Sequence, residues 1–64
     1  MRLTEFHERV HAEFGPVFGQ SVLRDHVLTA MGGVTASAAV ARGSNLRDIW
    51  RAICEDFDVP CERW

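Results

Sequence analysis

Lysine is absent from the sequence, and all seven cationic side chains are arginine. Nine acidic residues outnumber them, so the formal net charge is −2. This balance provides no general basic field that would attract nucleic acid or an anionic membrane. Long apolar runs are also absent, and the first five residues lack the apolar stretch of a signal peptide. We therefore expect a cytoplasmic protein that does not associate with membranes.

Cysteine is scarce and shows no metal-binding spacing. The two cysteines, Cys54 and Cys61, do not form a CxxC motif. In a reducing compartment both are expected to be free thiols, with Cys54 flanking the core and Cys61 exposed. The less favoured alternative is a disulfide between them across the Val59-Pro60 turn.

Repeats, linkers and low-complexity segments are absent too. A chain of 64 residues forms one domain at most, which we expect to span residues 1–64.

Apolar side chains recur at helical spacing in four segments, and no strand is expected. Thr4 and Asn45 are suitable N-caps for the first and last helices. Gly15-Pro16 and Gly32-Gly33 are typical helix ends. The pattern predicts an all-α fold, a small single-domain bundle of about four short helices. The predicted helices span residues 4–14, 16–31, 35–42 and 45–58, followed by a short C-terminal tail.

The apolar stripes of these helices predict the core. The clearest stripe belongs to the last helix, where the predicted core positions are Leu46, Ile49, Trp50, Ile53 and Phe57. In the first helix they are Leu3, Phe6, Val10 and Phe14. In the second helix they are Phe18, Val22, Leu23, Val27, Ala30 and Met31.

The segment HERVH, residues 7–11, reads as the H-E-x-x-H signature of zinc peptidases. A helix advances about 100° per residue, which places His7 at the edge of the apolar stripe and His11 further round it. Glu8 then points nearly opposite the core, and both histidines face solvent rather than a cleft. The positions of the longer motif's glycine and third histidine hold Phe14 and Val17. We therefore expect no catalytic or structural metal, and at most adventitious metal binding by His7 and His11.

Asp25 and His26 together have the composition of an acid–base pair. Adjacent residues on a helix diverge by about 100°, however, so Asp25 cannot readily orient the His26 ring. No serine or cysteine nucleophile is placed to complete a triad. We expect a half-buried His26 with a hydrogen-bond partner across the bundle. We also expect no enzymatic activity, no catalytic residues and no cofactor.

Residues 35–52 match the spacing of a helix-turn-helix, with a small residue, a turning glycine and an anchoring hydrophobe. Arg47 and Arg51 would then face DNA. Against this interpretation, Asp48 would lie on the same face and repel phosphate, and Trp50 would be costly to expose. A glycine-turned pair of helices with no role in DNA binding accounts for the same residues. DNA binding is thus the alternative function, and DNA is not the expected partner.

Four segments carry a family resemblance that extends almost end to end: MRLTEF at the start, RDHVL at residues 24–28, a glycine near 33, and DIWRAICEDFDVP at residues 48–60. They resemble the short actinobacterial proteins of domain of unknown function 3046. The resemblance implies a compact helical, cytoplasmic protein without an established activity, so no catalytic residues are carried over. It also implies that the second histidine of the HERVH segment lies outside the family pattern. Family gene neighbourhood beside recombinase A and its regulator implies an accessory role in DNA repair or recombination.

The leading functional hypothesis is a non-enzymatic protein-interaction or regulatory module. Its contact surface is expected near the last helix and the tail, at Trp50, Arg51, Arg63 and Trp64, because exposed aromatic and arginine side chains suit protein interfaces. The alternative for Trp50 is a purely structural place in the core. The expected partner is a protein that the sequence does not identify, and the sequence does not indicate an oligomeric state.

Overall fold

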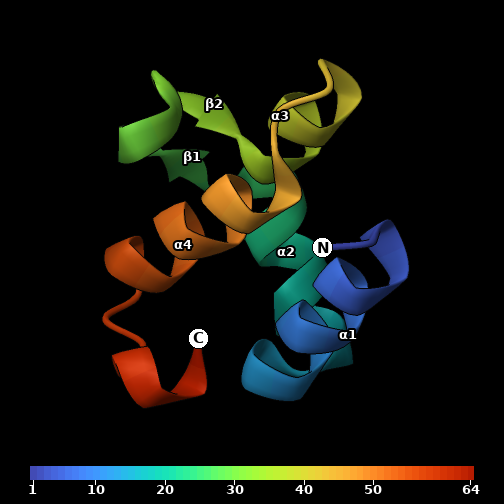
Figure 1. Cartoon of the computed structure of the whole chain (residues 1–64), viewed down its shortest axis with the longest axis vertical. Coiled ribbons are helices and arrows are strands. Elements are labelled where there is room, and N and C mark those ends of the chain that lie inside the picture. The colour runs from blue at the N-terminus through green and yellow to red at the C-terminus, as the bar shows by residue number, and fades with distance from the viewer.

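Four α-helices and one short β-hairpin make up the chain in the computed structural model, which describes residues 1–64. Figure 1 shows α1 beside α4, with the hairpin and α3 on one side of α4 and the C-terminal turn on the other. The predicted all-α class and the four helices are confirmed. In chain order the elements are α1 (Leu3–Phe14), α2 (Pro16–Asp25), β1 (Val27–Leu28), the 3-10 turn η1 (Thr29–Met31), β2 (Val34–Thr35), α3 (Ala36–Ala41), α4 (Leu46–Asp56) and the 3-10 turn η2 (Cys61–Arg63).

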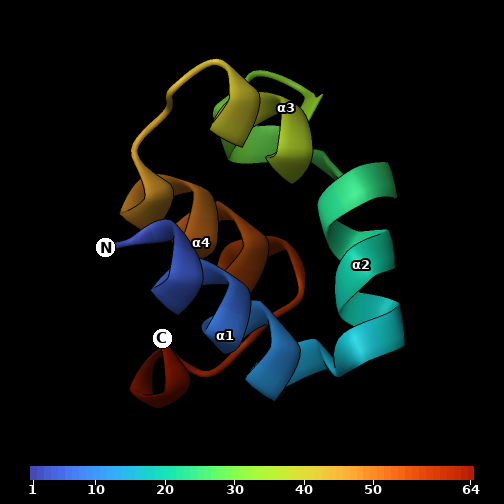
Figure 2. The same cartoon turned by 90° about the vertical axis from the view of Figure 1, so that its right-hand side faces the viewer.

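Helix α1 begins one residue earlier than predicted. Its N-cap is Arg2, which has an extended backbone and makes no side-chain cap, so the prediction of Thr4 as the cap is wrong. Its end is as predicted: Gly15 has φ 82°, and its N–H donates to the carbonyl of His11 over 2.8 Å. Pro16 then opens α2, where a missing N–H costs nothing. Figure 2 shows the resulting sharp corner between α1 and α2.

The prediction that the second helix extends to residue 31, and that no strand exists, is wrong. Helix α2 ends at Asp25, and His26 is extended with ψ 126°. Strand β1 pairs antiparallel with β2, in the register Val27↔Thr35 and Leu28↔Val34. Gly32 and Gly33, with φ 79° and 80°, end the 3-10 turn η1 and lead into β2, instead of ending a long second helix. Val27 is exposed while Leu28 is buried, which is the alternation of a strand.

Helix α4 is the centre of the core. Five of the 13 core residues belong to it, and it packs against α1, α3, β1 and η1. Asn45 caps it as predicted, because the side-chain oxygen accepts from the N–H groups of Arg47 and Asp48 over 2.9 and 3.2 Å. The helix ends at Asp56, two residues before the predicted end.

A Schellman-type turn reverses the chain after α4. Asp58 has φ 54°, its N–H donates to the carbonyl of Glu55, and the N–H of Val59 donates to the carbonyl of Cys54 over 2.9 Å. Buried Val59 anchors the turn against the core. This reversal directs η2 and Trp64 back toward α1, which places the end of the chain beside both α1 and α4 (Figure 1).

Four predicted core positions are wrong, and one of them is Ala30, which is exposed. Leu3, Phe18 and Val27 are 46%, 52% and 52% exposed. Leu3 is the first residue of α1 and lies at the exposed N-terminal end of that helix. Phe18 lies at the rim, where its ring meets Phe14 and Phe57 edge-on at centroid distances of 5.9 and 6.1 Å.

The contact between α1 and α2 depends on a glycine. A Cβ at buried Gly19 would lie 3.2 Å from Val10 Cγ1, which is tighter than an ordinary contact. The absence of that atom lets the two helices approach closely, so the residue that weakens α2 locally also permits its packing. None of the helices has both the length and the apolar composition needed to cross a bilayer.

A candidate binding pocket of arginines and tryptophans

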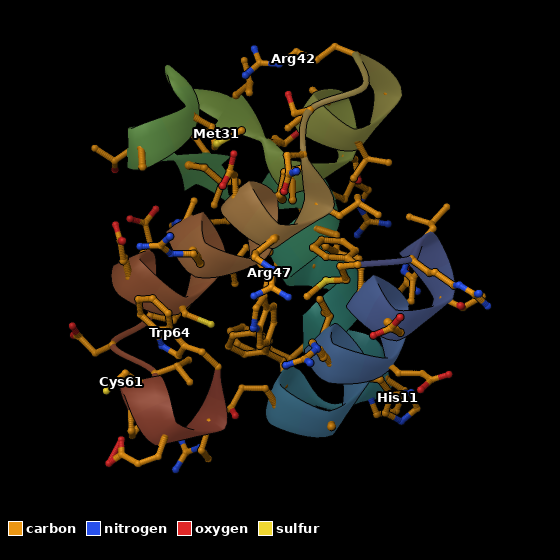
Figure 3. The ribbon with its side chains drawn as sticks, viewed as in Figure 1. His11, Met31, Arg42, Arg47, Cys61 and Trp64 are labelled. Atoms are coloured by element: carbon orange, nitrogen blue, oxygen red, sulfur yellow. The ribbon has the colours of Figure 1, made fainter.

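A hollow of about 330 Å³ opens where α1, α4 and the C-terminal turn meet. We refer to it as the arginine–tryptophan pocket. Figure 3 shows two of its labelled residues, Arg47 and Trp64, on the same face of the molecule, with His11 away on the other side of α1. Its six lining residues are Met1, Arg9, Arg47, Trp50, Arg51 and Trp64.

Hydrogen bonds fix the two tryptophans of this pocket. The Trp50 indole N–H donates to the carbonyl oxygen of Trp64 over 2.8 Å, and the Trp64 indole N–H donates to the carbonyl of Val59 over 2.8 Å. Trp50 is only 2% exposed and belongs to the core, so the expectation that it is exposed is wrong and its structural alternative is confirmed. Trp50 forms the floor of the pocket, whereas Trp64 is half-buried and forms a wall. Since both indole N–H groups have partners, the rings are held in one arrangement.

No Asp or Glu side chain pairs with the three arginines of the pocket. The ion pairs of the molecule are Arg24–Asp25 and Arg63–Glu13, and His26 contacts Asp56; none of these residues lines the pocket. Arg9 donates to the carbonyl oxygen of Trp64. The Arg51 guanidinium lies 5.8 Å from the centroid of the Trp64 ring, within cation–π range. The Arg47 side chain makes neither an ion pair nor a hydrogen bond.

Arg63, which the sequence suggested as a contact residue, lies outside the pocket. Its Nε and Nη2 donate to the two carboxylate oxygens of Glu13 over 3.1 and 3.0 Å. These hydrogen bonds, followed by the charge of Glu13, raise the pKa of Arg63. Arg63 thus ties η2 to α1 and holds the neighbouring Trp64 in place.

The structure brings together four of the residues selected from the sequence: Trp50, Arg51 and Trp64 from the interaction hypothesis, and Arg47 from the DNA hypothesis. It adds Met1 and Arg9, which the sequence did not indicate because they lie near the N-terminus, far along the chain from the last helix and the tail. No local pattern marks Arg9. Only the packing of α1 on α4 places it beside residues about 40 positions later in the chain.

The two histidines of α1 border a second, smaller hollow. It has a volume of about 260 Å³ and lies between α1 and α2, with Gln20 and Leu23 on its far side. The prediction that His7 and His11 face solvent rather than a cleft is therefore wrong in part, because both are exposed but line this hollow. Glu8 borders a different hollow. No group of three or more His, Cys, Asp or Glu residues stands close enough to hold a metal ion.

His26 has the cross-bundle partner that the sequence predicted. Its Nε2 lies 2.9 Å from Oδ2 of Asp56, and its half-buried ring packs 4.6 Å from the Phe57 ring. Asp56 also accepts from the N–H of Thr29 over 3.3 Å. Asp25 points elsewhere, toward Arg24 and Ser21. The His26–Asp56 contact therefore joins the end of α2 to the end of α4.

Both cysteines are free thiols, as predicted, and Cys61 is exposed. Cys54 lies inside the core rather than at its flank, with 0% exposure. Burial, followed by the charge of Glu13, raises the pKa of the Cys54 thiol from 9.0 to about 11. At neutral pH Cys54 is a protonated core side chain and not a nucleophile.

The chain resembles known proteins over nearly its whole length. The model of the family described as "Protein of unknown function (DUF3046)" matches residues 1–62. A protein of Mycobacterium tuberculosis that is described as a candidate envelope-preserving system protein is 53% identical over 36 residues. That segment covers 56% of this chain but only 13% of the relative. No solved structure matches the chain. The family match extends over nearly the whole sequence, and the chain therefore belongs to the DUF3046 family of proteins of unknown function.

Proposed function

We propose that the chain is a non-enzymatic, cytoplasmic protein-interaction or regulatory module that contacts its partner through the arginine–tryptophan pocket. The observation that carries the proposal is the set of three arginines, without Asp or Glu partners, around a hydrogen-bonded pair of tryptophans. Arginine and tryptophan are the side chains most enriched in the energetically dominant parts of protein interfaces.

The rigidity of the pocket supports the same proposal. Trp50 and Trp64 are held by hydrogen bonds, and Arg63 clamps the C-terminal turn to Glu13. Because these side chains are ordered before binding, a partner would not incur the entropic cost of ordering them. An accessory role in DNA repair or recombination, suggested by family gene neighbourhood, fits a module that acts through another protein. The description of the mycobacterial relative concerns a protein of which only 13% is matched.

DNA binding is the second candidate, because α3, a turn at Gly43 and α4 follow one another with Arg47 and Arg51 on the second helix. The geometry supports it less well. A recognition helix must enter the major groove, which is about 12 Å wide. Here the arginine-bearing face of α4 has Met1 and Arg9 on one side and Trp64 on the other. Helix α3 is also short, with six residues.

The test is affinity capture from an actinobacterial lysate, with and without nuclease, followed by mass spectrometry. The baits are the wild-type chain, the double variant Arg47→Gln/Arg51→Gln, and the matched control Arg24→Gln, which removes an exposed arginine of α2. We expect a nuclease-resistant partner that the wild type and the control capture and the double variant loses. Recovery that nuclease abolishes would support DNA binding instead. Recovery that the double variant leaves unchanged would refute the proposed surface.

A further inference from the structure

We infer that the arginine–tryptophan pocket binds an acidic peptide segment, in which two carboxylate side chains pair with Arg47 and Arg51 and a neighbouring apolar side chain packs against Trp64. This inference rests on the proposed interaction function and names the chemistry of its partner. It is carried by the distribution of charge, by the state of the individual arginines and by the size of the hollow.

The pocket is a positive island on a negative molecule. Three of the seven arginines line it and no acidic side chain does, whereas the rest of the chain has four arginines and nine acidic residues, a balance of −5. An acidic segment is therefore attracted to this position and repelled from the other surfaces. Such complementarity fixes the place and the orientation of docking more than it sets the affinity.

The arginines differ in how free they are. Arg9 already donates to the carbonyl oxygen of Trp64, and Arg51 is held near the Trp64 ring. Arg47 has no partner. Arg47 and Arg51 stand one helical turn apart, so their Cβ atoms are about 5–6 Å apart. In an extended peptide, residues i and i+2 point to the same side and are about 6.6 Å apart. Two acidic residues separated by one residue therefore match this arginine pair.

Nucleic acid fits the same features less well. A volume of about 330 Å³ is at the small end of ligand pockets and accommodates a few side chains. A specific duplex covers about 1,000–2,500 Å² of protein surface, far more than this island. The floor tryptophan, Trp50, is 2% exposed and offers no open face for stacking a base.

The probe is a fluorescein-labelled peptide of about ten residues with Asp and Glu two positions apart and leucines on either side. Its neutral counterpart has Asn and Gln in their place, and unlabelled inorganic phosphate and a random duplex serve as competitors. Anisotropy titrations use the full chain, the Arg47→Gln/Arg51→Gln double variant and the Arg24→Gln control. We expect the neutral peptide, and the double variant with the acidic peptide, each to bind about tenfold or more weakly, since each removes charge-assisted hydrogen bonds. The control should stay within about twofold of wild type, as expected of an exposed charge outside the site.

Equal binding of the acidic and neutral peptides would overturn the inference, and so would unchanged binding by the double variant. Stronger competition by the duplex would assign the island to nucleic acid, and competition by phosphate at similar concentration would reduce it to a general anion site. A lysate partner that depends on Arg47 and Arg51, together with no binding of the acidic peptide, would refute the acidic segment and leave the proposed function standing. Binding of the peptide without such a partner would refute the proposed function alone.

Discussion

Alkaline pH is expected to destabilise the protein through one buried thiol. Cys54 is fully buried in α4, and burial raises its pKa from 9.0 to about 11, with a further contribution from the charge of Glu13. The folded state therefore holds this proton more tightly than the unfolded chain does. Between pH 9.0 and about 11 the folded state binds more protons, so the free energy of unfolding falls as the pH rises. The contribution of the protonated Cys54 thiol to the free energy of unfolding is fully present below pH 9.0 and is lost as the pH rises to about 11.

The size of this loss follows from linkage. Each pH unit between the two pKa values corresponds to about 1.4 kcal/mol, so the whole window amounts to about 3 kcal/mol. A chain of this length has a total stability of about 3–10 kcal/mol. The loss is therefore a large part of the total, and it lowers the melting temperature by roughly 10–20 °C.

Few other groups titrate in this range. The sequence contains no tyrosine, and all seven Lys and Arg positions are arginine, which stays protonated. The assay is urea unfolding followed by far-ultraviolet circular dichroism at pH 8, 9, 10 and 11, in the presence of a reductant. Wild type is compared with Cys54→Ala and with Cys61→Ala, whose thiol is exposed. Cys54→Ala should be less stable by about 1 kcal/mol at pH 8, as a small cavity costs, and should reach or exceed wild type by pH 11. A wild-type profile as flat as that of Cys54→Ala would refute the reasoning, and so would flattening by Cys61→Ala.

Three further outcomes are expected from urea or thermal unfolding. Phe57→Ala should lower the free energy of unfolding by about 2–3 kcal/mol, which is less than for a fully buried ring because Phe57 is half-buried. Phe18→Ala should lower it by about 1 kcal/mol or less, because Phe18 lies at the exposed rim. Equal losses would place Phe57 at the rim as well. Gly19→Leu should cost about 2 kcal/mol or more, because even its Cβ would meet Val10 Cγ1 at 3.2 Å, and a neutral effect would mean that the two helices separate without penalty. Replacing both α1 histidines by alanine should leave the melting temperature within a few degrees, whereas unfolding of the wild type by a chelator would show that they hold a structural metal.

The parts of the fold that depend on local chemistry could be predicted from the sequence. The Asn45 cap and the Gly15-Pro16 corner follow from hydrogen bonds and backbone conformations that involve a few neighbouring residues. The stripe of α4 identified Ile49 and Ile53 as core residues for the same reason. The end of α2 at Asp25 could not be predicted in this way. Apolar residues continue past His26 at spacings that also suit a helix, and strands of two residues are too short to show alternation.

The candidate site was predicted in part. The last helix and the tail supplied Trp50, Arg51 and Trp64, because large aromatic and arginine side chains stand out by type alone. Arg9 could not be found in this way. It is one of seven arginines, and only the docking of α1 against α4 distinguishes it from the others. Arg63 has the same chemistry as Arg51, yet Glu13, which lies 50 positions away, removes it from the site.

The hydrogen-bonded pair of tryptophans also determines the optical behaviour of the protein. Trp50 and Trp64 are its two tryptophans, and there is no tyrosine, so its intrinsic emission comes from a single pocket. That emission reports whether the C-terminal turn is seated on α1 and α4, while far-ultraviolet dichroism reports the helices as a whole. Peripheral turns open at lower free energy than a core helix does. During denaturation the emission should therefore change before the helical signal, and the interval between the two transitions measures how independently the rim of the pocket opens.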